Sequence, residues 1–118
     1  MARQVLIVED EPHIVESLAF VLGREGFAVS SVMDGESALE NLRRAPPDLM
    51  IPRLNGFEVL KAAKSDAALR AIPVMVLTAK GQAHDRRLAE EIGSDGFMTK
   101  PFSNREFVEQ VRRLIGDA

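Results

Sequence analysis

Polar side chains that could do chemistry follow short apolar segments of this 118-residue sequence. Glu9 and Asp10 come directly after one apolar run, Thr78 ends a later run, and Lys100 follows the last one. Carboxylate oxygens are ligands for a hard divalent cation, and Thr78 and Lys100 add a hydroxyl and an ammonium group to this set. Asp48 follows two prolines, and it would join this group if a strand preceded it.

The segments that must position these side chains alternate between apolar runs and amphipathic stretches. Strands are expected at 4–8, 27–32, 72–78 and 95–99, and helices at 12–22, 34–44, 56–64, 84–93 and 103–115. This alternation predicts an α/β fold with a parallel sheet covered by helices on both faces. In open sheets of this kind, ligands bind beyond the carboxyl ends of the strands, where the polar residues listed above are expected to lie.

Composition limits the possible classes of protein. The chain is long enough for one domain, so residues 1–118 are expected to form a single unit. A net charge of −3 argues against direct binding to nucleic acid, and the absence of cysteine excludes disulfides and thiolate chemistry. The sequence has no apolar run near the ~20 residues of a membrane span, and its first residues do not resemble a signal peptide, so we expect a cytoplasmic location.

Four motifs in this order resemble the receiver domain of two-component response regulators, the CheY-like phospho-acceptor module. They are LIVEDEP at 6–12, DLMIPRLNG at 48–56, VLTAK at 76–80 and FMTKPF at 97–102, and the resemblance extends over essentially the whole chain. It implies a flavodoxin-like, doubly wound sheet of five parallel strands in the order 2-1-3-4-5. It also implies a signalling domain that catalyses only its own phosphoryl transfer and dephosphorylation, and not an enzyme acting on other substrates.

The third strand that this fold requires is apparently missing from the sequence. Asp10 and Asp48 are 38 positions apart, which is about five fewer than is usual in the family. Residues 43–47, Arg-Arg-Ala-Pro-Pro, cannot replace a central strand, because proline has no N–H and arginine does not suit a core buried on two sides. The shortfall is either a true deletion or a segment absent from the sequence as printed.

Two alignments of Asp48 are possible. In the preferred one, Asp48 is the acceptor, because Met50, Pro52 and Gly56 follow it in the family's D-x-M-x-P-x-x-x-G pattern. In the other, Asp48 is the acid that commonly begins the third strand, and the acceptor is lost.

The preferred alignment implies a role for each candidate residue. Asp10, Asp48 and the carbonyl of Met50 would bind Mg²⁺, and Glu9 would hold the ion through water. Asp48 would take a phosphoryl group from a histidine kinase or phosphotransfer protein, with Lys100 and Thr78 contacting the transferred oxygens. Lys100 precedes a proline, and in the family that peptide bond is typically cis.

The resemblance also implies a switch. Thr78 would turn toward the phosphoryl group, Phe97 would swing inward, and the surface formed by the fourth helix, fifth strand and fifth helix would change. Some members of the family form homodimers through that surface. Two alternatives stay open: a phosphorylation-independent receiver-like interaction module, and a flavin-binding flavodoxin-like domain. The acids of EDEP at 9–12 disfavour flavin, because they repel an unneutralised phosphate.

Overall fold

The computed structural model describes residues 2–52, 57–78 and 83–116, with the side chains of 78 and 83–85 not described. Five strands alternate with five helices along these residues. The strands are β1 (Gln4–Val8), β2 (Ala28–Val32), β3 (Leu49–Pro52), β4 (Met75–Thr78) and β5 (Gly96–Thr99), and the helices are α1 (Pro12–Arg24), α2 (Gly35–Arg44), α3 (Phe57–Ser65), α4 (Ala83–Ile92) and α5 (Asn104–Ile115).

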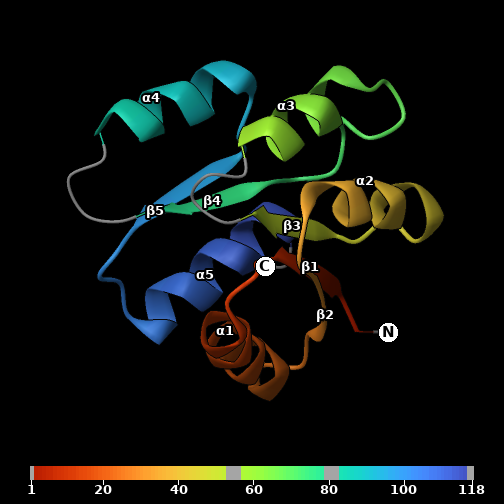
Figure 1. Cartoon of the computed structure of the whole chain (residues 1–118). Coiled ribbons are helices and arrows are strands. Elements are labelled where there is room, and N and C mark those ends of the chain that lie inside the picture. Colours follow the sequence, from red (N-terminus) through yellow and green to blue (C-terminus); the bar gives the residue numbers. More distant parts are fainter. Residues whose placement is uncertain (1, 53–56, 79–82, 117–118) are drawn as a thin grey trace.

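The helices form two layers, one on each face of the parallel strands. In Figure 1, α2, α3 and α4 lie on one side, and α1 and α5 lie on the other. Each layer closes its own apolar cluster. Leu6, Met50 and Val74 belong to the cluster toward α2, α3 and α4, and Ile7 and Phe107 belong to the cluster toward α1 and α5. The predicted flavodoxin-like α/β class is therefore confirmed.

The third strand is present, so the prediction that it is missing is wrong. Leu49, Met50 and Ile51 are almost fully buried, and β3 pairs in parallel with β1 from Val5↔Leu49 to Val8↔Pro52. A continuous apolar run buried on both faces is what a central parallel strand requires. The prediction failed because these residues had been read as the segment that follows an acceptor.

The sheet has the spatial order 2-1-3-4-5, but its hydrogen-bond ladder is interrupted. One sheet contains β2-β1-β3 and another contains β4-β5. The two are joined by an isolated bridge between Met50 and Val74. The five strands are thus arranged as expected, with a weak boundary between β3 and β4.

The helix boundaries follow local chemistry. Pro12 begins α1, where the missing N–H costs nothing. The side chain of Asp34 accepts a hydrogen bond from the backbone N–H of Ser37 and begins α2. Ser103 caps α5 by accepting a hydrogen bond from the backbone N–H of Glu106, three residues later.

Candidate functional site

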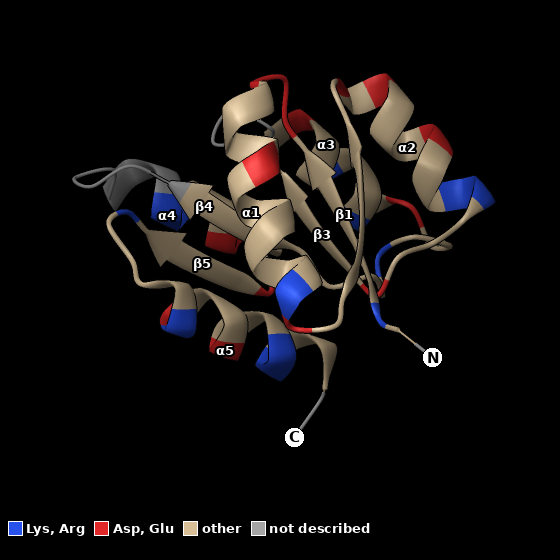
Figure 2. Ribbon diagram, turned by 90° about the horizontal axis from the view of Figure 1, so that it is seen from below, with Lys and Arg blue, Asp and Glu red and all other residues tan. Residues whose placement is uncertain are grey.

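The acids after β1 lie at the carboxyl-end rim of the sheet. In Figure 2 the red loop between β1 and α1 lies at the opposite end of the strands from the amino terminus of the chain. Glu9 is half-buried and Asp10 is exposed. Oε2 of Glu9 accepts hydrogen bonds from the backbone N–H groups of Asp10 and Glu11, at 2.9 and 3.0 Å. The Glu9 side chain therefore folds back onto its own loop and orders the entry to α1.

Asp48 lies at the other end of the strands. Its backbone N–H donates to the carbonyl of Gln4 at 2.8 Å, and its Oδ2 accepts from the N–H of Gln4 at 2.7 Å. Oδ1 is 3.7 Å from Nη1 of Arg3. Gln4 begins β1 and Asp10 follows its end, so about 13 Å of strand separates Gln4 from Val8 alone, at ~3.3 Å per residue. The predicted convergence of Asp48 with Glu9 and Asp10 is wrong, and the placement of Asp48 at the start of the third strand is the one observed.

Met50 does not lie at the rim either. Its side chain is fully buried, its N–H donates to the carbonyl of Pro73 at 2.9 Å, and it is the β3 residue of the bridge to Val74. The predicted coordination of a metal ion by its carbonyl, together with Asp48 and Asp10, is therefore not formed.

The described residues do not fit the predicted magnesium site. Within residues 2–52, 57–78 and 83–116, no group of three or more His, Cys, Asp or Glu side chains is placed to hold a metal ion. The sequence itself offers no acid between Asp48 and Glu58. Among the described residues, the two acids at the end of β1 are thus not joined by the third carboxylate that the resemblance implies.

The residues predicted at the ends of β4 and β5 lie where expected along the backbone. Thr78 is the last residue of β4 and pairs with Thr99, but its side chain falls outside the described part of the structure. Lys100 follows β5 and is exposed, and its peptide bond to Pro101 is cis, as the resemblance implies.

Phe97 is half-buried in β5, in contact with the apolar cluster that contains Leu6 and Val76. The guanidinium carbon of Arg86, on α4, lies 5.6 Å from the centroid of the Phe97 ring. This distance is within the range of a cation–π contact, so α4 and β5 are linked at the residue predicted to switch. The predicted swing of Phe97 stays a prediction.

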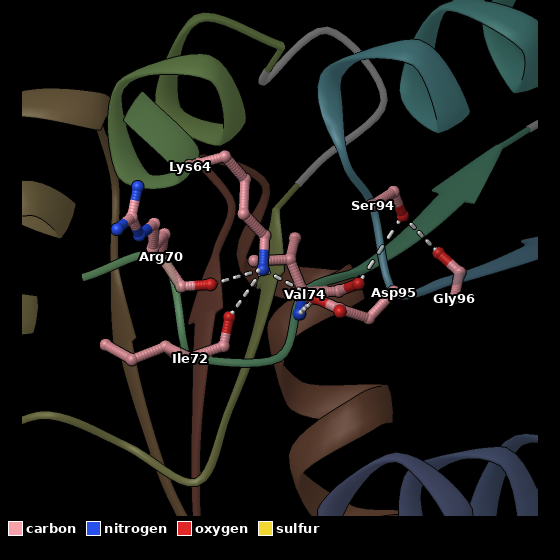
Figure 3. A network of polar contacts seen from close by, with 7 residues as sticks. All are labelled: Lys64, Arg70, Ile72, Val74, Ser94, Asp95 and Gly96. Carbon is pink, nitrogen blue, oxygen red and sulfur yellow. Dashed lines mark hydrogen bonds and ion pairs between the residues drawn. The ribbon is translucent and has the colours of Figure 1, made fainter. Parts of the chain in front are cut away.

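A polar cluster at the amino ends of β4 and β5 was missed from the sequence. Nζ of Lys64 donates to the carbonyls of Arg70 and Ile72 and to Oδ2 of Asp95, at 3.1, 2.9 and 2.7 Å (Figure 3). Oδ2 of Asp95 also accepts from the N–H of Val74 at 2.9 Å. The available signal was weak: a lysine at the end of a helical stretch usually faces solvent, and nothing in the sequence pairs it with an acid 31 positions away.

Two carboxyl groups elsewhere have lowered pKa values. The pKa of Asp34 lies below its usual value of 3.8 because its carboxylate accepts a hydrogen bond from the backbone N–H of Ser37. The pKa of Asp66 is lowered first by the N–H of Ala68 and then by the side chain of Arg43, 3.0 Å away. Both shifts stem from turn and helix-cap geometry, so neither indicates a catalytic acid or base.

The fold and the rim define a class of protein. Parallel strands in the order 2-1-3-4-5, acids after β1 and a lysine joined by a cis bond to proline after β5 are the features of a CheY-like receiver domain. The response regulator receiver domain family model matches residues 5–112, and the chain belongs to this family. Phosphorylation and Mg²⁺ are typical of it.

Known proteins agree with this assignment. The chain is 40% identical over 120 residues to the phosphate regulon transcriptional regulatory protein PhoB of Klebsiella pneumoniae, covering 98% of this chain and 52% of PhoB. The structure resembles chemotaxis response regulator CheY4 of Vibrio cholerae, with a TM-score of 0.87 and 25% identity over 97% of this chain and 99% of CheY4. It also resembles the receiver domain of sensor histidine kinase PA1611 from Pseudomonas aeruginosa, a structure with a magnesium ion in its active site cleft, with a TM-score of 0.88 and 25% identity over 98% and 99% of the two chains.

The chain spans about half the length of the PhoB relative that it matches. Among the described residues, no helix is both long and apolar enough to span a membrane.

Proposed function

We propose that this chain is a receiver domain that acts as a phosphorylation-independent interaction module. The observation that carries the proposal is the position of Asp48. Its carboxylate is bonded to the N–H of Gln4 at the amino ends of β1 and β3, far from the rim where Glu9, Asp10 and Lys100 lie. A phosphoryl group on Asp48 would be out of reach of that lysine and those acids, so its charge would have no partner at the rim.

The rest of the receiver architecture favours an interaction role. All five helices and both apolar clusters are present among the described residues, so α4, β5 and α5 have an apolar core on which to form a surface. In this function the chain binds a protein partner through a face that is already ordered. We propose a homodimer through α4, β5 and α5 as one assembly of this kind.

A second candidate function is the phosphoryl switch typical of the family. It is favoured by the retention of Glu9, Asp10 and Lys100 at one rim. In this candidate a histidine kinase or phosphotransfer protein donates to Asp48, Lys100 and Thr78 contact the transferred oxygens, and Phe97 carries the change to α4-β5-α5. It requires the segment around Asp48 to rearrange so that the acid reaches the rim. For both candidates we propose a cytoplasmic location.

Intact-mass measurement after incubation with a small phosphodonor and Mg²⁺ separates the two. A receiver domain known to accept phosphoryl groups serves as the positive control, and Asp48→Asn as the matched variant. We expect no adduct of about 80 Da, the mass of one phosphoryl group, under conditions that modify the control. An adduct that disappears in Asp48→Asn would establish the phosphoryl switch and overturn the proposal. An adduct that persists in the variant would also overturn it, by locating the acceptor elsewhere.

A further inference from the structure

The β3–β4 seam, the boundary between Leu49–Pro52 and Met75–Thr78, contains one isolated bridge among the described residues. Met50 donates to the carbonyl of Pro73 at 2.9 Å and forms the isolated bridge to Val74. In a parallel ladder the donors that face one neighbour come from every second residue. The next donor of β3 toward β4 is therefore residue 52, which is proline and has no N–H. This proline explains why the described residues of β3 form no second bridge to β4.

On either side of the seam the ladders are complete. β1 pairs with β2 and with β3 over their lengths, and β4 pairs with β5 from Met75↔Gly96 to Thr78↔Thr99. The parallel strands therefore form two backbone-bonded units, β2-β1-β3 and β4-β5.

Lys64 adds a polar link between these units. It extends from α3, whose buried Leu60 and Ala63 pack in one cluster with Leu6 and Met50. Its ammonium group binds the carbonyls of Arg70 and Ile72, which lead into β4, and the carboxylate of Asp95, which precedes β5 (Figure 3).

The position of Lys64 makes these bonds strong. Its side chain is only 12% exposed, and Oδ2 of Asp95 is shared between Nζ of Lys64 and the N–H of Val74. Hydrogen bonds to a charged group are stronger than neutral ones, and partial burial reduces their screening by water. Apolar packing also crosses the seam on both faces of the sheet, since Met50 and Val76 belong to one cluster and Ile51 and Leu77 belong to the other. Separation at the seam therefore costs the burial of these side chains, and the open form is a minor state.

We propose that β4-β5, with α4, is a unit that opens from β2-β1-β3 at the β3–β4 seam, and that Lys64 is the residue that holds it closed. The opening separates the two groups of rim residues, because Glu9 and Asp10 follow β1 while Thr78 and Lys100 follow β4 and β5. It also moves α4 and β5 relative to β1, so a partner that contacts both units favours the closed form, because those contacts are lost on opening. This inference does not depend on whether Asp48 accepts a phosphoryl group.

Hydrogen exchange by NMR on the full chain tests the proposal. The amide of Met50, which donates across the seam, is compared with the amides of Val5–Val8, which lie between two strands. In each variant, the exchange rate of Met50 is divided by that of the β1 amides, and this ratio removes the effect of any change in global stability. We expect Met50 to exchange faster than the slowest β1 amides in the unmodified chain, and Lys64→Met to raise the ratio by about tenfold or more, as the loss of charged hydrogen bonds implies.

Two further variants complete the design. Lys61→Met removes an exposed lysine one turn earlier on α3 and should leave the ratio unchanged. Pro52→Val supplies the missing donor and should lower the ratio by slowing exchange at Met50. The proposal is overturned if Lys64→Met accelerates amide exchange equally at Met50 and at the β1 amides, and Pro52→Val does not slow exchange at Met50. If Lys64→Met does not fold, the Pro52→Val result alone decides in the same way.

Discussion

Replacing Asp48 by alanine tests whether its carboxylate joins the starts of β1 and β3 or instead accepts a phosphoryl group. In the structure its carboxylate bonds the N–H of Gln4 at 2.7 Å and lies 3.7 Å from Arg3. Both contacts tie the start of β3 to the start of β1. We therefore expect Asp48→Ala to destabilise the fold and to leave the carboxyl-end rim unchanged.

The magnitude follows from the two contacts. A hydrogen bond to a charged group contributes about 1.5–3 kcal/mol, and this value is reduced here because the Asp48 side chain is 37% exposed. The contact with Arg3 joins two exposed side chains and contributes about 0–1 kcal/mol. We expect Asp48→Ala to lower the free energy of unfolding by about 1–2 kcal/mol. Asp48→Asn keeps an oxygen acceptor for Gln4 and should cost about half as much.

Urea unfolding followed by far-ultraviolet circular dichroism measures these values, since the chain has no Trp or Tyr to report by fluorescence. The slope of the transition should stay constant, so the change appears in the midpoint. Asp48→Ala and Asp48→Asn with unchanged stability would refute the structural role. Increased stability in Asp48→Asn would point to relief of a strained carboxylate, as expected of an acceptor crowded by other acids.

Two further predictions concern the fold. Asp34 and Asp66 have pKa values below 3.8, so each contributes stability that is present above the unfolded-state pKa and is lost as the pH falls through the folded-state pKa. In thermal unfolding from pH 6 downward, the melting temperature should therefore fall less steeply with pH for Asp34→Asn than for the unmodified chain. An identical pH dependence of the two melting temperatures would contradict the assignment. Gly35→Ala should destabilise the fold by about 1–3 kcal/mol, because the added Cβ would lie 2.6 Å from Cγ2 of Val59. Gly23→Ala should instead stabilise α1 by about 0.5–1 kcal/mol, because no atom lies within 4 Å of its added Cβ. Equal effects of the two substitutions in urea unfolding would show that helix propensity alone decides both.

Much of the fold was predictable because local signals agreed with one another. The strands at 4–8 and 95–99, the capped helix after Ser103 and the two-layer arrangement all follow from periodicity and caps, and the structure has each of them within a residue or two. The lysine after β5 was also located correctly, because its position depends only on the end of a strand. These predictions succeeded because each rested on a local signal, whereas the one for residues 43–52 failed because two patterns competed there.

The site could not be predicted in the same way, because it depends on strand register. A one-residue change in register exchanges the faces of a strand, and a shift of several residues moves an acid from one rim to the other. The Lys64–Asp95 pair depends on the same long-range arrangement, since it joins α3 to the start of β5. No local property of either residue indicates its partner.

The register itself is explained by the cost of the alternative. If Asp48 stood at the carboxyl-end rim, beside the end of β1, the residues paired with β1 would be those at 44–47, Arg-Ala-Pro-Pro. Two prolines would remove ladder donors, and Arg44 would enter a core that is closed on both faces. In the observed register Leu49, Met50 and Ile51 take those places and are at most 2% exposed, which stabilises the fold by about 1.5–3 kcal/mol for each side chain. Burial of three apolar side chains thus outweighs anything that one exposed carboxylate could contribute at the rim. The D-x-M-x-P pattern that indicated an acceptor is, in this chain, a strand start followed by its buried residues.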